Sequence, residues 1–335
     1  MSALFTPLKV GSVTISNRIG MSALTRNRAT GAIANDTMRD YYVQRAKGGA
    51  GLIVTEAILV TRLGAEWPAA PGLWDVSQVE GWKNIIDGVH AAGSKIYAQS
   101  ELPDPKTVVA LFKKAAEHAK AAGFDGIETH GANGYIVHQF LDNTANKRTD
   151  AYGGSPANRS RFALEVIAAL QQVFAGDVAI KLSPTSGLND VSMPLDETVA
   201  TFGYLLREID QLPTPLSYVV LAQYNSRLDS EFNGKLRAMQ FDVVEVFKPY
   251  FASGRTHLFV NAGLQVTDAE ALIGDGSNTV KAVFFGFNWL IYPDFAKRAE
   301  YRMPLENELD WMHLYGVEGT DPAIGYTDYK AAVFY

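Results

Sequence analysis

Eight short, nearly continuous apolar runs constrain the fold of this chain more than any other feature. They occupy residues 18–24, 51–57, 95–100, 126–131, 178–184, 218–224, 257–263 and 282–287. Runs of this kind are typical of parallel strands that are buried on both faces. Amphipathic stretches separate them, most clearly at residues 79–93, 106–123, 159–174 and 195–209. Gly93 and Gly123 end the first two stretches, as glycine often ends a helix.

This alternation predicts an α/β fold, a (β/α)8 TIM barrel. A doubly wound open sheet shows the same alternation and is the alternative. The number of runs favours the barrel, and so does the lack of a GxGxxG motif after the first run. KGGAG at residues 47–51 lacks the third glycine and precedes a strand, so we interpret it as a turn. Because the composition shows no linker, we expect one domain over residues 1–335.

Composition narrows the function classes. The chain has no cysteine, which excludes disulfides, thiolate metal sites, iron–sulfur clusters and a cysteine nucleophile. Its six histidines show no HExxH-like spacing, so we expect no metal. The formal net charge of −6 argues against nucleic acid as a partner. The N-terminus does not resemble a signal peptide, and the apolar run at 282–292 is too short to span a bilayer. We therefore expect a cytoplasmic protein with no membrane partner.

In a (β/α)8 barrel the active site is built at the carboxyl ends of the strands. This rule selects residues 23–26, 56–57, 99, 130–135, 181–183, 223–224, 261–263 and 286–287. Barrels often bind phosphate between the loops after the last two strands, on backbone amides that glycine leaves exposed. Gly263 and Gly286 occupy these loops, and the alternative is that both only serve tight turns.

The exit of the fourth predicted strand holds three polar side chains in six residues. His130, Asn133 and Tyr135 are interleaved with Gly131 and Gly134, which we expect to permit a sharp turn. An imidazole N–H and an amide NH₂ can donate to one oxygen and stabilise charge that develops there. A tyrosine hydroxyl, with a pKa of about 10, suits the protonation of a basic carbanion. Each residue alone has a structural alternative: a core histidine, a capping asparagine, a packed tyrosine. Together with a phosphate site, they indicate addition of hydride and a proton across a polarised double bond.

One long segment resembles a known family. Residues 130–162, HGANGYIVHQFLDNTANKRTDAYGGSPANRSRF, are similar to the signature of old yellow enzymes, the FMN-dependent ene-reductases. Further similarities lie at residues 4–29, 259–263, 284–289 and 325–329. The resemblance implies bound FMN, NADPH as the hydride donor, and an activated alkene such as an α,β-unsaturated carbonyl compound as substrate. It implies that His130 and Asn133 hold the substrate oxygen and that Tyr135 supplies the proton.

The resemblance also implies a flavin site. Thr25 matches a threonine at the isoalloxazine edge, Gln99 a glutamine at the pyrimidine ring, and Ala57 a small residue beneath it. Lys181 stands where many relatives have arginine, and its cation would stabilise the reduced anionic flavin. The remaining expected contacts are Ala23 at the first strand exit, the backbone amides of Gly263, Gly286 and Phe287 at the phosphate, and Tyr315 near the substrate.

Two departures from the family pattern affect these expectations. Phe287 replaces an arginine that commonly helps to neutralise the phosphate, so we expect weaker FMN binding. After Gln99 the family continues into a long excursion that forms a hairpin lid, whereas here SELPDPKTVVALF leads almost directly into a helix. Without the lid, solvent reaches the site and weakens its electrostatic contacts. We expect retained flavin binding with poorer turnover or broader substrate tolerance.

Other functions remain as alternatives. A catalytically compromised FMN-binding flavoprotein is favoured by Phe287 and the missing lid. A hydroxy-acid oxidase needs a histidine base late in the barrel, and His257 begins its strand at the wrong end. An isomerase of the same family would have phenylalanine in place of Tyr135. We expect a monomer or a homodimer.

Overall fold

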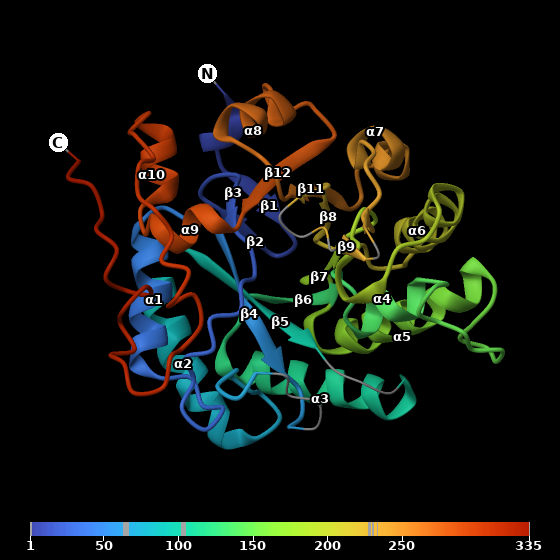
Figure 1. Cartoon of the computed structure of the whole chain (residues 1–335), viewed down its shortest axis with the longest axis horizontal. Helices are drawn as coiled ribbons and strands as arrows, with labels where there is room; N and C mark the ends of the chain where they lie inside the picture. The colour runs from blue at the N-terminus through green and yellow to red at the C-terminus, as the bar shows by residue number, and fades with distance from the viewer. Residues whose placement is uncertain are drawn as a thin grey trace.

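The computed structural model describes residues 2–62, 67–101, 105–226, 229, 231–232 and 234–334. Its centre is a closed barrel of eight parallel strands, in agreement with the fold predicted from the sequence (Figure 1). The strands, in the order of the barrel, are β3 (Ile19–Met21), β4 (Leu52–Leu59), β5 (Lys95–Glu101), β6 (Gly126–Gly131), β7 (Val178–Leu182), β8 (Tyr218–Ala222), β11 (His257–Asn261) and β12 (Val280–Phe285).

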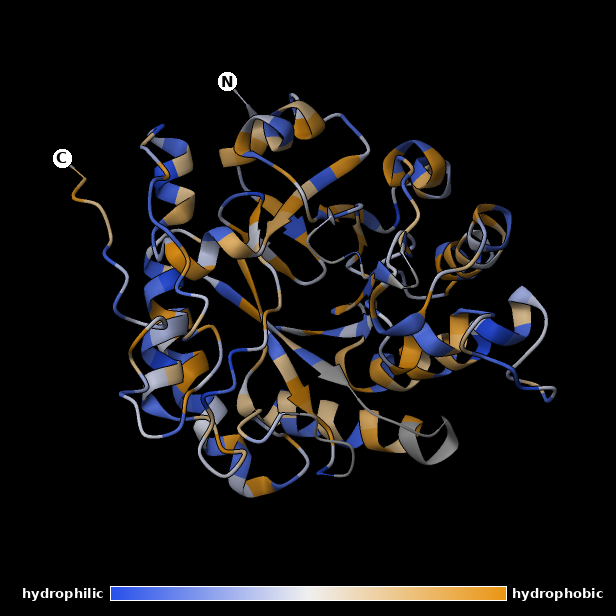
Figure 2. Cartoon of the chain, viewed as in Figure 1, coloured by the Kyte–Doolittle hydropathy of each residue, from blue (hydrophilic) through white to orange (hydrophobic). Residues whose placement is uncertain are grey.

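The helices surround the barrel (Figure 1) and show mixed polar and apolar residues along their length (Figure 2). They are α1 (Asp36–Lys47), α2 (Val76–Ala91), α3 (Pro105–Ala122), α4 (Ile136–Leu141), α5 (Pro156–Phe174), α6 (Leu195–Asp210), α7 (Val243–Phe247), α8 (Val266–Ile273), α9 (Phe287–Ile291) and α10 (Phe295–Glu300). Short 3₁₀ turns are η1 (Ala3–Phe5), η2 (Leu188–Asp190) and η4 (Lys248–Phe251).

Local signals explain where the main helices begin and end. At the start of α2 the Asp75 carboxylate accepts a hydrogen bond from the backbone N–H of Ser77. The Gln78 side chain in turn accepts from the Asp75 backbone N–H, which completes a capping box. Ser155 caps α5, and Pro156 follows at its first position. Gly123 takes a left-handed φ of 98° after α3, as the sequence suggested.

Side chains alternate between the two faces of the barrel strands and so build two cores. The interior core includes Leu52, Val54, Tyr97, Tyr218 and Phe259, which are fully buried. The alternate positions face outward and pack against the helices. Glu128, His130 and Lys181 share the alternation of the interior residues on β6 and β7, so polar groups lie inside the barrel near its carboxyl end.

The amino-terminal end of the barrel is closed by a two-stranded antiparallel hairpin, β1 (Leu8–Val10) with β2 (Val13–Ile15). Val10 and Ile15 are buried against the interior core. His257 begins β11 at this closed end, as predicted. A second hairpin, β9 (Glu231–Phe232) with β10 (Lys235–Leu236), follows β8. The open end is therefore the carboxyl end of the strands.

The carboxyl-terminal segment is held against this open end by two buried arginines. Arg26 donates from Nε to the carbonyl of Leu314 (2.9 Å) and from Nη2 to that of Gly325 (2.6 Å). Arg28 donates from Nη2 to the carbonyl of His313 (2.8 Å). These bonds place Tyr315 at the rim of the barrel.

Candidate active site

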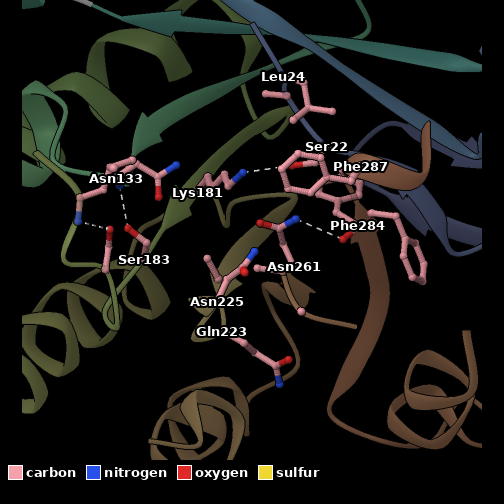
Figure 3. Close-up of a pocket in the computed structure, with 18 of the residues that line it drawn as sticks. Ser22, Leu24, Asn133, Lys181, Ser183, Gln223, Asn225, Asn261, Phe284 and Phe287 are labelled. Atoms are coloured by element: carbon pink, nitrogen blue, oxygen red, sulfur yellow. Dashed lines mark hydrogen bonds between the residues drawn. The ribbon is translucent and has the colours of Figure 1, made fainter. Parts of the chain in front are cut away.

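The loops at the carboxyl ends of the strands enclose a pocket of about 450 Å³. Every residue predicted from the sequence to contact cofactor or substrate lines it: Ala23, Thr25, Ala57, Gln99, His130, Asn133, Tyr135, Lys181, Gly263, Gly286, Phe287 and Tyr315. Figure 3 shows side chains from several of these strand ends around the pocket. The structure thus brings these residues together around one pocket, whereas their contacts with cofactor and substrate stay predictions.

The turn after β6 presents Asn133 in a strained conformation. Asn133 has a φ of 57°, a region that asparagine tolerates better than most residues. Its backbone N–H donates to Ser183 Oγ (2.7 Å), and its carbonyl accepts from Asn189 Nδ2 (2.9 Å), as Figure 3 shows in part. Gly134 follows with a φ of 73°, and a Cβ there would lie 2.4 Å from the Leu188 carbonyl. The loop after β7 therefore fixes the position of Asn133.

Gly131 and Gly134 have different structural roles at the end of β6. Gly134 supplies the sharp turn that the sequence predicted. Gly131 is instead the last residue of β6, and a Cβ there would lie 3.0 Å from the Lys181 carbonyl. Gly131 thus permits close packing of β6 on β7 and does not itself make the turn.

His130 is buried and uncharged at neutral pH. Its pKa is lowered to about 3, mainly by burial and to a smaller extent by the nearby Lys181 and His138. Among the described residues its Nδ1 atom has no hydrogen-bond partner. A neutral imidazole keeps one N–H donor at every pH above this pKa. His130 can therefore act as a hydrogen-bond donor and is poorly suited to be a general acid.

Tyr135 lies beside His130 at the start of α4, with ring centroids 5.0 Å apart. Both it and Asn133 are partly exposed to the pocket, whereas His130 is 6% exposed. The three side chains predicted to act together are thus gathered along one wall. This arrangement can polarise an oxygen and deliver a proton nearby.

Two hydrogen-bonded pairs of polar side chains lie at the base of the pocket or directly behind it. Lys181 Nζ donates to Ser22 Oγ (3.0 Å; Figure 3). Gln99 Nε2 donates to Glu128 Oε1 (2.8 Å). Burial lowers the pKa of Lys181, and the charge of Glu128 raises it. Lys181 is the cationic side chain among the described residues that line the pocket, so it dominates the local potential.

The ends of β11 and β12 offer backbone amides rather than charges. Ala262 and Gly263 both have left-handed φ values, of 73° and 69°. Gly286 and Phe287 follow β12 at the start of α9. The Phe287 ring lies 5.9 Å from that of Trp311, so it packs toward the carboxyl-terminal segment. Neutral polar side chains complete this part of the lining: Gln223, Asn225, Gln265 and Asn288.

Among the residues of the site that sequence reasoning missed, Trp67 and Glu128 are the most informative. Trp67 lines the pocket and stacks on Tyr315, with ring centroids 4.3 Å apart. It follows β4 in a loop with no motif, so nothing in the sequence indicated its position. Glu128 was not selected because it lies two residues before the strand end at which the selected residues begin. Its alternation with His130 would have placed it inside the barrel.

The pocket fits a flavin mononucleotide. It combines an amide and a cation at its base with small residues at the strand ends, among them Gly263 and Gly286, whose lack of a Cβ leaves room beside the backbone. The unpartnered His130 Nδ1 and the paired donors of the β6 turn suit a second, oxygen-bearing ligand above it. Within the described residues, no group of acidic and histidine side chains could hold a metal, and no helix has the length and apolarity to cross a membrane.

A barrel with this pocket belongs to the class of flavin-dependent oxidoreductases. A model of the NADH:flavin oxidoreductase / NADH oxidase family matches residues 3–102 and 103–306. The chain therefore belongs to this family of FMN-binding oxidoreductases, which includes the old yellow enzymes predicted from the sequence.

Individual relatives agree with this assignment. The flavin oxidoreductase hxnT of Emericella nidulans is 32% identical over 396 aligned positions, which cover 99% of this chain and 98% of the relative. Morphinone reductase in complex with tetrahydroNAD has a TM-score of 0.83 and 29% identity, over 99% of this chain and 98% of its own. The old yellow enzyme homologue from Zymomonas mobilis has a TM-score of 0.84 and 27% identity, over 98% and 99%.

Proposed function

We propose that the protein is an NADPH-dependent ene-reductase that reduces the C=C bond of α,β-unsaturated carbonyl compounds or similar activated alkenes. The gathering of His130, Asn133 and Tyr135 in the pocket that Gln99 and Lys181 also line is the observation that carries this proposal. The family relationship supports FMN as the resident cofactor and a nicotinamide coenzyme as the electron source. The preference for NADPH and the class of substrate are our proposal and do not follow from the family relationship.

The residues that would hold FMN come from several strand ends. Thr25, Ala57 and Gln99 would contact the ring system, and Lys181 would balance the negative charge of its reduced form. The backbone amides near Gly263 and Gly286 would hold the phosphate. When bound, FMN supplies a hydride that it has received from the coenzyme.

The substrate wall would act on the carbonyl end of the alkene. The N–H of neutral His130 and the amide of Asn133 donate to the substrate oxygen and stabilise the charge that develops there as hydride adds to the β-carbon. Tyr135 then gives its hydroxyl proton to the α-carbon. The electron pair of the C=C bond forms the new bond to that proton, so the product is the saturated carbonyl compound and the tyrosinate is reprotonated from water.

An anaerobic mixing experiment tests this proposal. NADPH is expected to bleach the flavin absorbance of the purified protein, and a simple cyclic enone is expected to restore it. The same titration with NADH measures the coenzyme preference. A yellow protein that never bleaches, or stays reduced after enone is added, would instead support the catalytically compromised flavoprotein. A colourless protein that takes up no FMN would remove both functions.

The proposed absence of the lid concerns the connection after β5. β5 ends at Glu101 and α3 begins at Pro105, which leaves no room for an excursion of several tens of residues. Residues 102–104 themselves lie outside the described residues. The family model also matches in two stretches that meet at residues 102 and 103. The 396 aligned positions with hxnT exceed the 335 residues of this chain, as an insertion in the relative requires.

Grafting a family-type loop after Gln99 tests whether the lid matters. We expect the graft to lower the apparent KM for a cyclic enone, because excluding water strengthens the hydrogen bonds to the substrate oxygen. A graft of equal length made of glycine and serine controls for the insertion itself. Equal KM values for the two grafts and the parent would show that the lid has no role in this chain.

A further inference from the structure

A buried carboxylate inside the barrel has no role in the chemistry described so far. Glu128 lies in the middle of β6 and is 1% exposed. It is the direct register partner of Gln99 on β5 and of Ala179 on β7. His130, two residues further along β6, is the register partner of Lys181. Glu128 is therefore level with Gln99 and lies one interior layer below His130 and Lys181.

The carboxylate determines which way the Gln99 amide points. A carboxylate only accepts hydrogen bonds, so the group of Gln99 that faces it must be the NH₂. The distance between Gln99 Nε2 and Glu128 Oε1 is 2.8 Å. The backbone N–H of Gln99 is held as well, by Thr55 Oγ1 at 3.0 Å. With its NH₂ committed to Glu128, Gln99 has its carbonyl oxygen available as an acceptor toward the pocket that it lines.

Glu128 also acts on the charge of the pocket. Burial raises the pKa of Glu128, and the charge of Lys181 together with the hydrogen bond from Gln99 lowers it. Lys181 is held by Ser22 Oγ and is 5% exposed, so solvent screens its interaction with Glu128 only weakly. The positive charge that a ligand meets at the base of the pocket is thus reduced by an anion behind it.

We propose that Glu128 is a positioning residue for the flavin: it fixes the Gln99 amide as an acceptor and offsets the charge of Lys181. The inference rests on FMN as the occupant of the pocket. An acceptor oxygen at Gln99 suits the imide N–H of a flavin pyrimidine ring. A partly offset cation restrains the stabilisation of the anionic reduced flavin, so Glu128 lowers the reduction potential of the bound cofactor.

Two substitutions separate orientation from charge. Glu128→Gln removes the charge but can still accept from Gln99 Nε2 through its amide oxygen. We expect it to raise the affinity for reduced FMN, relative to oxidised FMN, by about tenfold, which is about 30 mV for a two-electron couple. Glu128→Asp keeps the charge but shortens the side chain and breaks the contact. We expect it to weaken binding of oxidised FMN by about tenfold without this rise in potential.

Asp125→Asn is the matched control. Asp125 is likewise a carboxylate of this segment, although only partly buried, and it bonds to His90 and to the Ile96 amide at the opposite end of the strand. This variant is expected to change thermal stability and to leave both FMN affinity and potential as in the parent. An equal potential shift in Asp125→Asn would mean that charge anywhere in the barrel acts alike, which overturns a specific role for Glu128.

Potential and affinity are read by anaerobic dye-coupled reduction and by fluorescence titration of the apoprotein with FMN. A potential for Glu128→Gln equal to that of the parent overturns the charge role, and unchanged FMN affinity in Glu128→Asp overturns the orienting role. If Glu128→Gln does not fold, Glu128→Asp still decides the second point. Failure of the parent protein itself to bind FMN would refute the proposed function instead, so the two failures are distinct.

Discussion

Two sides of the same pocket are built on different principles. On the β6–β7 side, the side chains of His130, Asn133, Lys181 and Ser183 line the pocket, and hydrogen bonds hold the Asn133 backbone and Lys181 Nζ. On the β11–β12 side, formed by residues 262–263 and 286–287, the lining side chains carry no charge, and Ala262 and Gly263 have left-handed φ values.

The difference shows which positions of such a site tolerate change. A backbone N–H binds an anion whatever side chain the residue has, so Phe287 can occupy a phosphate loop without abolishing it. An imidazole N–H or a tyrosine hydroxyl has no backbone substitute. We therefore expect substitutions on the β6–β7 side to affect the chemical steps, and those on the β11–β12 side to affect cofactor affinity.

The largest effect is expected for Tyr135→Phe. Loss of a positioned proton donor typically costs about 10²–10⁴ in rate. The rate at which an enone reoxidises the reduced flavin should fall by this factor in stopped-flow absorbance, whereas reduction by NADPH should stay within about twofold. Tyr301→Phe makes the same change at a side chain that is 61% exposed and should leave both rates unaltered. An unaltered reoxidation rate in Tyr135→Phe would assign the proton to solvent.

The second prediction concerns acid and the β6–β7 side. Burial lowers the pKa of His138, behind the turn, from 6.5 to about 4, although Asp142 opposes the shift. Between these values the unfolded chain binds a proton that the folded protein does not, so stability falls as the pH decreases. Because pH 5 lies about 1.5 units below the ordinary histidine pKa, keeping His138 unprotonated lowers the free energy of unfolding by about 2 kcal/mol at that pH.

Urea denaturation at pH 7.5 and pH 5 measures this cost. His138→Asn keeps an acceptor near the Gly134 amide, which bonds to His138 Nδ1 at 3.2 Å, but cannot take up the proton. We expect this variant to lose about 2 kcal/mol less than the parent between the two pH values. The same loss in both proteins would place the acid sensitivity elsewhere.

The third prediction is a gain on the β11–β12 side. Phe287→Arg adds a cation next to the expected phosphate, where a charge pair at about 4 Å contributes from about 1 kcal/mol in water to about 4 kcal/mol near a protein surface. FMN affinity should rise by about tenfold or more, and the gain should shrink in high salt. Riboflavin, which lacks the phosphate, and Phe287→Leu, which adds no charge, are the controls. A gain with riboflavin would show that the arginine acts on the ring and not on the phosphate.

Much of the fold was predictable because burial on both faces leaves a strong signal. The predicted run at 126–131 coincides with β6, and the run at 257–263 extends only two residues beyond β11. The predicted runs at 18–24 and 178–184 extend past β3 and β7 into the mouth of the barrel, whereas the run at 51–57 ends two residues before β4 does. Helix α1 was missed because its buried face, although it has helical spacing, carries Tyr41, Tyr42 and Arg45, so the sequence shows little apolar contrast between its faces.

The sequence predicted the residues of the candidate site that belong to motifs or strand ends, but not the residues that hold them. Strand exits and the family resemblance located the lining residues, since those positions follow from chain order alone. The partners that hold them, such as Ser183 and Asn189 for Asn133, depend on which loops meet in space. No spacing rule relates residues about 50 positions apart, so these contacts needed the structure.

Ser183→Ala tests whether such a partner matters, and it is the smallest effect expected. Ser183 Oγ accepts a hydrogen bond from the backbone N–H of Asn133 at 2.7 Å, and a hydrogen bond of this kind contributes about 0.5–1.5 kcal/mol. Its loss should let Asn133 leave its left-handed conformation, so the KM for an enone should rise by roughly threefold to tenfold with little change in the rate of flavin reduction.

Ser192→Ala is the matched control, because Ser192 lies in the same loop but bonds to the Arg237 carbonyl, away from the pocket. A second variant, Asn189→Ala, removes the bond to the Asn133 carbonyl and should raise KM in the same direction. If the KM values of Ser183→Ala and Asn189→Ala both equal that of Ser192→Ala, the turn after β6 holds Asn133 in place without these two hydrogen bonds. The β6–β7 side would then be as self-sufficient as the backbone loops opposite it, and the contrast between the two sides would lie in chemistry alone.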